Sequence, residues 1–423
     1  MNRAMLALGA ALAIAAILSS SRTAAQARSA PPLQALVDAA PEGSTLLLPS
    51  GIHRGPIVVS KRLELVGAPD AEIAVGAEAD DPSFEGDALR IAADDVVVRG
   101  LRVRGSGSSL AGLDAGIYAR GRGIRIELCE IRGALFGVRL DRCEDSSVSG
   151  CAISGRRGLA FAARGDGIRV SGGSGIAIAD TRISYACDGI YLDGTASPRI
   201  ARCEVSDGRY GLHVMYGSGA AVEGLSARRM IVGAMVMGTE AVSISRSSFE
   251  DGRDPRSAGV VLFESEGCSC RDSRMSSQLD GVLLSGARGC RLERNLVSGN
   301  ARGITLEGDD GGCLVAGNAF IGNRQQVAGP VGLGSLAWSE AGRGNYWDDY
   351  RGYDFDDDGI GDSPYRRPRS YGALGARVQL AAIFFGSPLQ RAVDDLDPSA
   401  EIVDPSPLIK PPDIGRKAGS AGE

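Results

Sequence analysis

Soft metal ligands occur in this chain as two close pairs of residues. It has only two histidines and seven methionines, and four of these residues are His213, Met215, Met235 and Met237. Imidazole and thioether groups suit copper(I), whereas hard cations prefer oxygen ligands. The two pairs stand 22 residues apart, so they can form one site only if the chain folds with that period. The pattern predicts a copper(I) site, and it is equally typical of an apolar docking face without metal.

Oxygen ligands gather further along the chain. Asp354, Asp356 and Asp358 occupy alternate positions before Gly359, as at the start of an EF-hand-like calcium loop. The glutamate expected at the twelfth position of such a loop is missing, because Tyr365 stands there. The segment predicts either a structural calcium ion or a hydrogen-bonded acidic turn.

Paired carboxylates raise an enzymatic alternative. Asp166 and Asp188 each precede a glycine, 22 residues apart, and Asp280 stands in the same sequence context. Two carboxyl groups about 5 Å apart could serve a retaining glycosidase. Asp-Gly is also ordinary turn chemistry, and no substrate-gripping aromatic groove accompanies the pair. Polysaccharide binding or cleavage is therefore the second hypothesis, behind a protein that is not an enzyme.

A repeated phrase specifies the elements that position these residues. Glycine followed by aliphatic, variable and aliphatic residues recurs about every 22 positions. The phrase begins at Gly137, Gly167, Gly189, Gly211, Gly233, Gly259, Gly281 and Gly303. Such a period with short aliphatic strands predicts an all-β fold, a right-handed parallel β-helix with one coil per repeat.

The predicted register stacks residues one period apart on neighbouring strands. Aliphatic residues of each phrase point inward and variable residues point outward. Tyr191, His213 and Met235 then form one outward column in solvent, with Met215 and Met237 two residues further along. Outward apolar groups on a solenoid suggest a partner, so Tyr191, Tyr216 and Phe263 are predicted docking residues.

The remaining segments are the ends of the rod. An apolar run after Arg3 and a small-residue cleavage site near Ala27 predict an export signal and a periplasmic or extracellular location. An apolar stretch containing Phe384 and Phe385 predicts either a partner-docking tail or a segment folded back on the rod. The predicted divisions are a signal peptide at 1–27, a β-helix with a helical N-terminal cap at 28–328, a C-terminal cap at 329–371 and a Pro-rich tail at 372–423. Loops are expected at 156–165 and 251–257.

Composition limits the partners and the cysteine chemistry. The net charge of −6 and the pI near 5.3 argue against nucleic acid as the natural partner. In the predicted register six of the nine cysteines fall into two columns, namely Cys129, Cys151 and Cys203, and Cys268, Cys290 and Cys313. Unreactive core thiols are the main hypothesis. A Cys268–Cys290 disulfide and a metal-binding ladder are the alternatives.

Several motifs together resemble the NosD family of periplasmic β-helix proteins. The general ones are the segment from Leu33 to Gly67 and the Gly-Asn-Tyr-Trp sequence at 344–347. The more specific ones are Ser106–Leu110 leading to Asp114–Ile117, and Arg209–Tyr216 followed by Val232–Met237. The resemblance covers nearly the whole chain after residue 27.

The resemblance implies a role in maturation of nitrous oxide reductase. NosD-like proteins work with the ATPase and permease subunits of an ABC transporter, and receive copper from a lipoprotein chaperone. They support assembly of the copper–sulfur cluster of the reductase. The resemblance further implies that the tail after Val378 contacts the permease, so that this chain meets the membrane only through partners.

Overall fold

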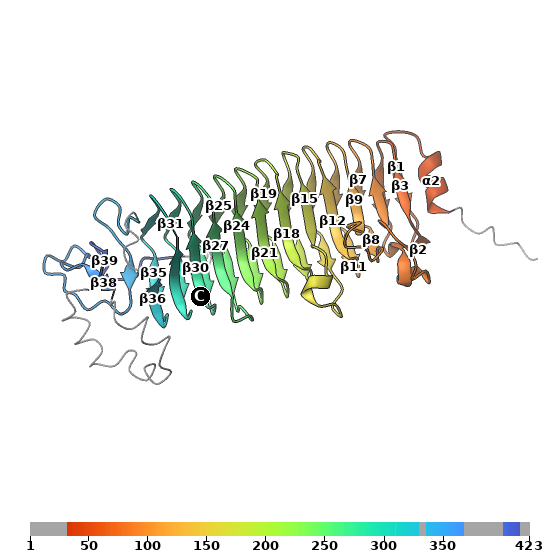
Figure 1. Ribbon diagram of the computed structural model, residues 1–423. Coiled ribbons are helices and arrows are strands. Elements are labelled where there is room, and N and C mark those ends of the chain that lie inside the picture. The colour runs from red at the N-terminus through yellow and green to blue at the C-terminus, as the bar shows by residue number, and fades with distance from the viewer. Residues whose placement is uncertain (1–31, 309, 330–335, 368–400, 415–423) are drawn as a thin grey trace, which may run out of the picture.

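The computed structural model describes residues 32–308, 310–329, 336–367 and 401–414. It is a rod of stacked coils, with α2 (Leu33–Ala39) at one end and the two-stranded sheet of β38 (Tyr365–Arg367) and β39 (Glu401–Asp404) at the other (Figure 1). Three parallel sheets of 12, 13 and 12 strands run along the rod, here called sheets A, B and C. The predicted parallel β-helix is confirmed.

Each coil contributes one strand to each sheet. Sheet A contains β1 (Thr45–Leu48), β4 (Glu64–Gly67), β7 (Val97–Arg99), β10 (Arg125–Glu127), β13 (Ser147–Ser149), β16 (Ala177–Ala179), β19 (Arg199–Ala201), β22 (Ala221–Glu223), β25 (Ser243–Ser245), β28 (Ser269–Arg271), β31 (Arg291–Glu293) and β34 (Leu314–Ala316). Sheet B contains β2 (Gly51–Arg54), β5 (Ala71–Ala74), β8 (Arg102–Arg104), β11 (Glu130–Arg132), β14 (Ala152–Ser154), β17 (Arg182–Ser184), β20 (Glu204–Ser206), β23 (Ser226–Arg228), β26 (Ser248–Glu250), β29 (Arg274–Ser276), β32 (Leu296–Ser298), β35 (Ala319–Ile321) and β37 (Tyr346–Trp347). Sheet C contains β3 (Ile57–Val59), β6 (Leu89–Ile91), β9 (Ala115–Ala119), β12 (Phe136–Asp141), β15 (Ile168–Ser171), β18 (Asp188–Asp193), β21 (Tyr210–Met215), β24 (Val232–Met237), β27 (Ala258–Phe263), β30 (Asp280–Ser285), β33 (Arg302–Glu307) and β36 (Gln325–Ala328).

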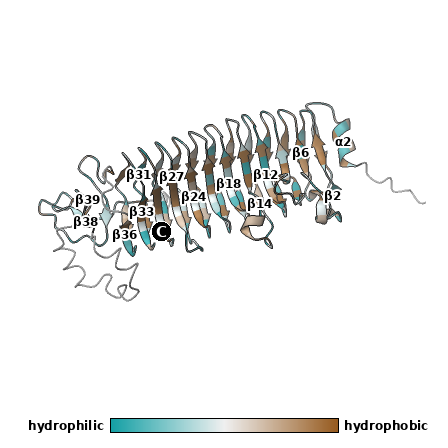
Figure 2. Cartoon of the chain, viewed as in Figure 1, coloured by the Kyte–Doolittle hydropathy of each residue, from teal (hydrophilic) through white to brown (hydrophobic). Residues whose placement is uncertain are grey.

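The hydrophobic core is a narrow column inside the coils. In the short strands of sheets A and B the central residue is usually the buried one, as with Ile126, Val148 and Ile178 on successive coils. Hydrophobic residues follow the strands of the rod (Figure 2). Because each coil buries its residues against the next, the core grows with the number of repeats.

The glycine of the repeated phrase permits close stacking of the coils. A Cβ atom at Gly211 would lie 2.5 Å from the carbonyl oxygen of Gly233 and 2.6 Å from the Cβ of Ala227. Real side chains do not approach so closely, so any other residue would push adjacent coils apart. Gly211, the second residue of β21, is therefore required because there is no room for a side chain, and not because of a turn conformation.

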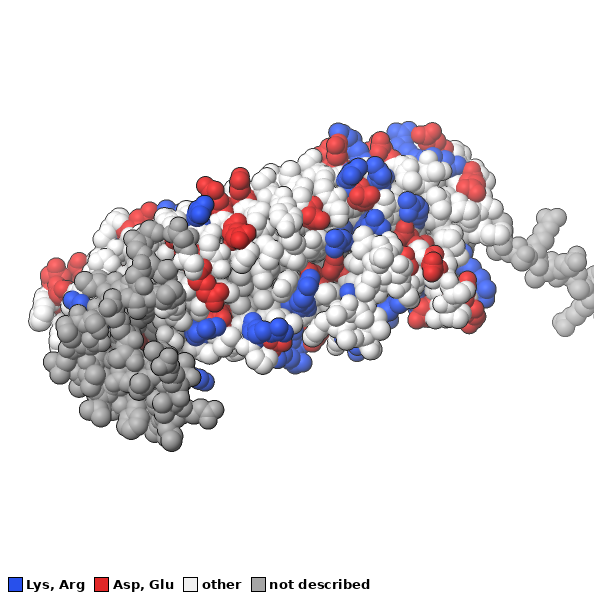
Figure 3. Space-filling view, viewed as in Figure 1, with Lys and Arg blue, Asp and Glu red and all other residues white. Residues whose placement is uncertain are grey.

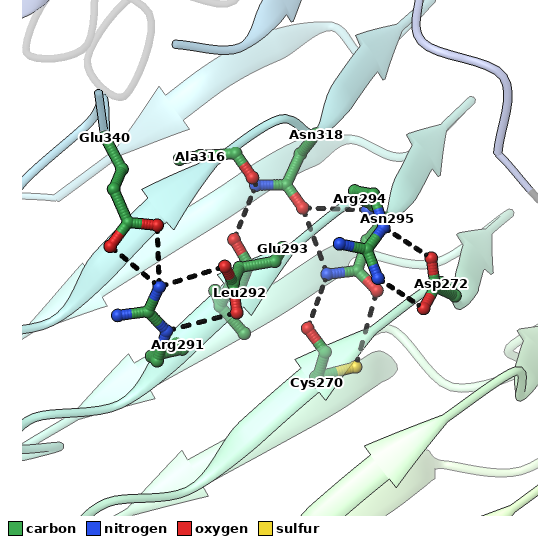
Figure 4. Close-up of polar contacts among 10 residues, drawn as sticks. All are labelled: Cys270, Asp272, Arg291, Leu292, Glu293, Arg294, Asn295, Ala316, Asn318 and Glu340. Atoms are coloured by element: carbon green, nitrogen blue, oxygen red, sulfur yellow. Dashed lines mark hydrogen bonds and ion pairs between the residues drawn. The ribbon is translucent and has the colours of Figure 1, made fainter. Parts of the chain in front are cut away.

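The inner corner between sheets A and B carries side-chain ladders. Cys129, Cys151 and Cys203 lie in this column, and all nine cysteines are free thiols. Towards the C-terminus the same column changes to asparagine (Figure 4). Asn295 donates to the Cys270 carbonyl oxygen at 2.8 Å and to Asn318 Oδ1 at 3.0 Å. These bonds satisfy buried polar groups, so the ladder is stabilising.

Both ends of the rod are closed. At the N-terminal end α2 buries Leu33 and Val37, as expected for a cap. At the other end the Trp347 ring stacks between Phe320 and Tyr365, with centroids 4.4 Å from each. Asp404 is fully buried there and accepts a hydrogen bond from Trp347 Nε1 at 3.0 Å.

Part of the predicted tail belongs to this C-terminal cap. β39 pairs with β38, and Leu408 forms backbone bridges with Tyr346 and Ile360. Residues 401–414 thus pack back on the rod. The signal peptide at 1–27 and the apolar residues Phe384 and Phe385 lie outside the described residues.

Two loops leave the coils where the repeat spacing widens. One contains the short 3-10 helix η2 (Phe161–Ala163), and the other spans 251–257. A second 3-10 helix, η1 (Gly76–Ala79), lies near the N-terminal cap. The first loop is held by Arg156, whose guanidinium donates to the carbonyl oxygens of Gly133 and Gly107, both at 2.9 Å. Both loops precede strands of sheet C, so they flank the face that carries the candidate site.

Candidate metal centre

The predicted register of the soft ligands is present on sheet C. Tyr191 pairs with His213, and His213 pairs with Met235 on the next strand. Met215 pairs with Met237 in the same way. Val214 and Val236 alternate with these residues and lie in the core, which places the four ligand candidates on the outer face. The structure therefore brings His213 and the three methionines together.

The expected exposure of His213 is wrong. Its side chain lies on the outer face, yet the residue is only 6% exposed. The rings of Tyr191 and Tyr210 approach it edge-on, with centroid distances of 4.8 and 4.9 Å. Neighbouring side chains on the outer face therefore cover the imidazole, which sits in a pocket of aromatic edges.

One imidazole nitrogen of His213 has a partner and the other has none. Nδ1 lies 2.8 Å from Asp188 Oδ2, and Asp188 is itself fully buried. Nε2 is buried and has no hydrogen-bond partner among the described residues. A buried nitrogen without a partner is costly, so it indicates a missing ligand. A carboxylate on Nδ1 with a free Nε2 is the usual arrangement of a metal-binding histidine.

An arginine keeps the supporting carboxylate charged. Arg209 contacts both oxygens of Asp188, at 2.8 Å from Nε and 2.7 Å from Nη2. Burial would raise the pKa of Asp188, but hydrogen bonds from His213 and Arg209 outweigh it and lower the pKa. The ionised carboxylate favours a proton on Nδ1 of His213, which leaves the lone pair on Nε2.

The thioethers complete a donor set that fits copper(I). Met235 and Met237 are half-buried on the outer face, one coil beyond His213 and Met215. The Tyr191 hydroxyl donates to the Met215 sulfur at 3.3 Å, and a second sulfur lone pair stays available. One buried imidazole nitrogen and neighbouring thioethers suit a soft monovalent ion better than a hard cation.

Sequence reasoning missed the role of Asp188 and Arg209. Asp188 stands 25 residues before His213, one coil plus three positions, so it lies outside the column of variable residues. The same offset recurs in Asp280, which bonds to Thr305 and pairs with Arg302. This repeated spacing of aspartate and arginine could have predicted the Asp188–Arg209 pair from the sequence. It also shows that the fold forms the same carboxylate–arginine pair where no histidine is present.

The carboxylate pair considered for glycoside cleavage is engaged in ion pairs. Asp166 bonds to Arg169 at 2.9 Å, while Asp188 holds Arg209 and His213. Asp166, Cys187 and Asp188 have ligand atoms within 4.8 Å of one another. Both Asp188 oxygens thus accept hydrogen bonds from Arg209 or His213, while burial and the charge of Asp188 raise the pKa of Asp166 to about 6.

The surface around the site is apolar. Val232, Ala258 and Val261 form a buried cluster on the outer face, covered by Met235 and Phe263, among others. Tyr191 is half-buried, whereas Tyr216 is 68% exposed. The surface over β21, β24 and β27 is largely uncharged, in contrast to the strands nearer α2 (Figure 3). The predicted docking residues Tyr191, Tyr216 and Phe263 thus border the candidate site.

In the acidic loop of the C-terminal cap, the three aspartates predicted to bind calcium bring their carboxylate groups together. Carboxylate oxygens of Asp354, Asp356 and Asp358 lie within 4.8 Å of one another. Asp354 also accepts hydrogen bonds from the amides of Asp358 and Gly359, at 3.1 and 2.9 Å. The repulsion from Asp358 raises the pKa of Asp356. A calcium ion and a hydrogen-bonded acidic turn are both compatible with this loop.

Calcium is expected to stabilise the protein if the loop binds it. A bound ion adds stability in proportion to the logarithm of its concentration over its Kd, about 2.7 kcal/mol at one hundred times Kd. Thermal unfolding with 2 mM CaCl₂ and with EDTA measures this. The control is Asp356→Asn, which should abolish the difference, and an unchanged Tm in wild type would leave only the acidic turn.

A carboxyl group in the same cap, that of Asp349, should make stability depend on pH. Burial, and then the charge of Asp348, raises the pKa of Asp349 from 3.8 to about 6. Folding then binds a proton between these values, so this group's contribution to the free energy of unfolding falls as pH rises from 4 to 6. Asp349→Asn keeps an acceptor for the Tyr365 hydroxyl. We expect it to raise the Tm at pH 7.5 and leave it nearly unchanged at pH 4; equal shifts at both would contradict this origin.

Comparison with known proteins identifies the family. A family model described as "Periplasmic copper-binding protein (NosD)" matches residues 149–352, which include the candidate site. A protein from Pseudomonas aeruginosa named "Probable ABC transporter binding protein NosD" is 30% identical over 372 residues, covering 75% of this chain and 76% of the relative. The chain belongs to the NosD family. A NosD of the same name from Stutzerimonas stutzeri is 28% identical over 335 residues, covering 75% and 74%.

Solved structures share the fold of this NosD family member. The A-module of mannuronan C-5 epimerase AlgE6 from Azotobacter vinelandii aligns with a TM-score of 0.56 at 15% identity, covering 73% of this chain and 92% of the module. The periplasmic alginate epimerase AlgG aligns with a TM-score of 0.51 at 10% identity, covering 73% and 82%. These likenesses show the fold alone. No helix in the described part of the chain is long and apolar enough to cross a membrane.

Proposed function

We propose that this NosD family member is a copper-handling binding protein rather than an enzyme. Its cargo is copper(I), bound transiently by His213 Nε2 with Met215, Met235 and Met237. The observation that carries this proposal is the buried Nε2 of His213, which has no partner among the described residues, on the outer face of two paired strands that also carry Met215, Met235 and Met237. The family description as copper-binding and the relatives' names as binding proteins are consistent with it.

The proposed biological role is maturation of nitrous oxide reductase. The site would receive copper from a lipoprotein chaperone and pass it on for assembly of the copper–sulfur cluster, in a complex with the permease and ATPase of an ABC transporter. The apolar border of Tyr191, Tyr216 and Phe263 gives a donor or acceptor protein a surface next to the ion. Thioether ligands suit transfer because copper(I) exchanges readily between soft ligands of similar strength.

Copper titration tests the site. Wild type and a His213→Ala, Met235→Ala double variant are titrated with copper(I) under reducing, anaerobic conditions against a chromophoric chelator. We expect one high-affinity copper(I) per chain in wild type and its loss in the double variant. Equal stoichiometry and affinity in both would leave the outer face as a docking surface without metal.

A further inference from the structure

A second site lies on a different face of the rod. A groove of about 1650 Å³ follows the outer face of sheet B, lined by Ile414 of the C-terminal segment and by residues from β11 through β29. These are seven consecutive strands of that sheet, so the groove extends over about 29 Å at 4.8 Å per coil. Its axis follows the rod, which suits an elongated ligand.

The lining combines guanidinium, hydroxyl and carboxylate groups. Its cations are Arg132, Arg157, Arg182, Arg202, Arg228, Arg229, Arg246 and Arg274, and its anions are Glu130, Glu204, Glu250 and Asp272. Six of the eight arginines form ion pairs, three of them with Asp180, Asp207 and Glu223 beside the lining. Within the described residues Arg157 and Arg274 have no carboxylate partner, so these two carry the excess positive charge of the groove, although the chain as a whole carries −6. The groove therefore favours a negatively charged ligand.

Most of these arginines can turn to a ligand at low cost. Arg182 pairs with Glu204 at 3.3 Å, and both side chains are more than 60% exposed. Exposed pairs of this kind contribute about 0–1 kcal/mol, so a ligand carboxylate can replace the protein's own. In the described part of the chain Arg157 and Arg274 have no carboxylate partner, and Arg157 stacks on Tyr185 at 4.2 Å.

Serines repeat along the floor with the period of the coils. Ser154, Ser184 and Ser206 pair on successive strands, and Ser248 donates to Ser226 at 3.3 Å. Each of the five coils from β14 to β26 thus offers a hydroxyl beside charged groups. In the part of the chain that the structure describes, no aromatic side chain lines the groove, so bases would find no stacking surface, and nucleic acid is a poor fit.

We propose that this groove binds a linear acidic polysaccharide of the uronate type, independently of copper. Such a polymer presents carboxylates to the arginines at intervals along its length. Its hydroxyl groups can donate to Glu130, Glu204, Glu250 and Asp272, and exchange hydrogen bonds with the serines. A polymer of phosphate alone lacks these donors and would be repelled by the four carboxylates.

Binding of uronate oligomers tests the proposal with the full-length mature protein. Isothermal titration with oligogalacturonate of about ten sugars, in 150 mM NaCl, gives the affinity of wild type. Arg157→Glu with Arg274→Glu reverses two cations that hold no protein carboxylate, so the ion-pair ladder stays intact. We expect at least tenfold weaker binding and unchanged copper(I) stoichiometry.

The matched control is Arg120→Glu with Arg288→Glu. Both arginines are exposed, lie outside the groove lining and lack a carboxylate partner in the described residues. This variant has the same net charge, and we expect wild-type affinity. An equal loss in both variants, equal affinity for polyphosphate of matched charge, or no binding by wild type would each overturn the proposal. None of these outcomes bears on the copper site.

Discussion

Asp188→Asn is expected to weaken copper(I) binding by about 10- to 100-fold, the usual cost of removing the carboxylate behind a metal-binding histidine. Asp188 is fully buried and bonds to His213 Nδ1 at 2.8 Å. An amide in its place can donate to Nδ1, which moves the imidazole proton to Nε2 and removes the lone pair that faces the ion. The affinity is measured by competition with a chromophoric copper(I) chelator, and the tautomer by ¹⁵N NMR of the imidazole.

The matched control for this substitution is Asp280→Asn. Asp280 occupies the same position of its coil, is buried, and pairs with Arg302 as Asp188 pairs with Arg209. Both variants should lose stability, since each leaves an arginine with a weaker partner. Only Asp188→Asn should change copper affinity. Equal affinities for copper in the two variants would show that Asp188 supports the fold and not the ligand.

Replacing Met215, Met235 and Met237 together with leucine should weaken copper(I) binding by roughly 100-fold or more, about 2.7 kcal/mol. Leucine has nearly the volume and hydrophobicity of methionine, so the outer face and its packing are retained. The substitution removes only the thioether sulfurs, which separates metal binding from docking. The same chelator competition measures the effect, with Met230→Leu and Met275→Leu, two core methionines, as the control.

Retention of wild-type copper affinity in the triple leucine variant would contradict the proposed donor set. In that case the methionines would serve as apolar contact residues beside His213. Loss of copper affinity with wild-type unfolding behaviour would support thioether ligation, because a misfolded surface would also lower the Tm. The circular dichroism melt therefore accompanies each titration.

Tertiary structure decided the details that turn a column of residues into a site. The periodic phrase placed His213 beside Met235 and on the outer face, as the strand pairs confirm. It did not predict that His213 is buried, because Tyr210 and Asp188 belong to other positions of the repeat. The repeat period predicts which residues are neighbours one coil apart. It does not predict which side chains from other positions of the repeat are long enough to contact or cover them.

The sequence by itself determined the parallel β-helix, its coil period, the helical cap and the two loops, because each follows from local spacing of glycine and aliphatic residues. The closure of the C-terminal cap by residues 401–414 depends on contacts far apart in the chain, such as Asp404 with Trp347. The unpartnered nitrogen of His213 and the groove on sheet B also arise only from packing. Local pattern fixes which face a residue takes, and only the assembled coils decide what covers it.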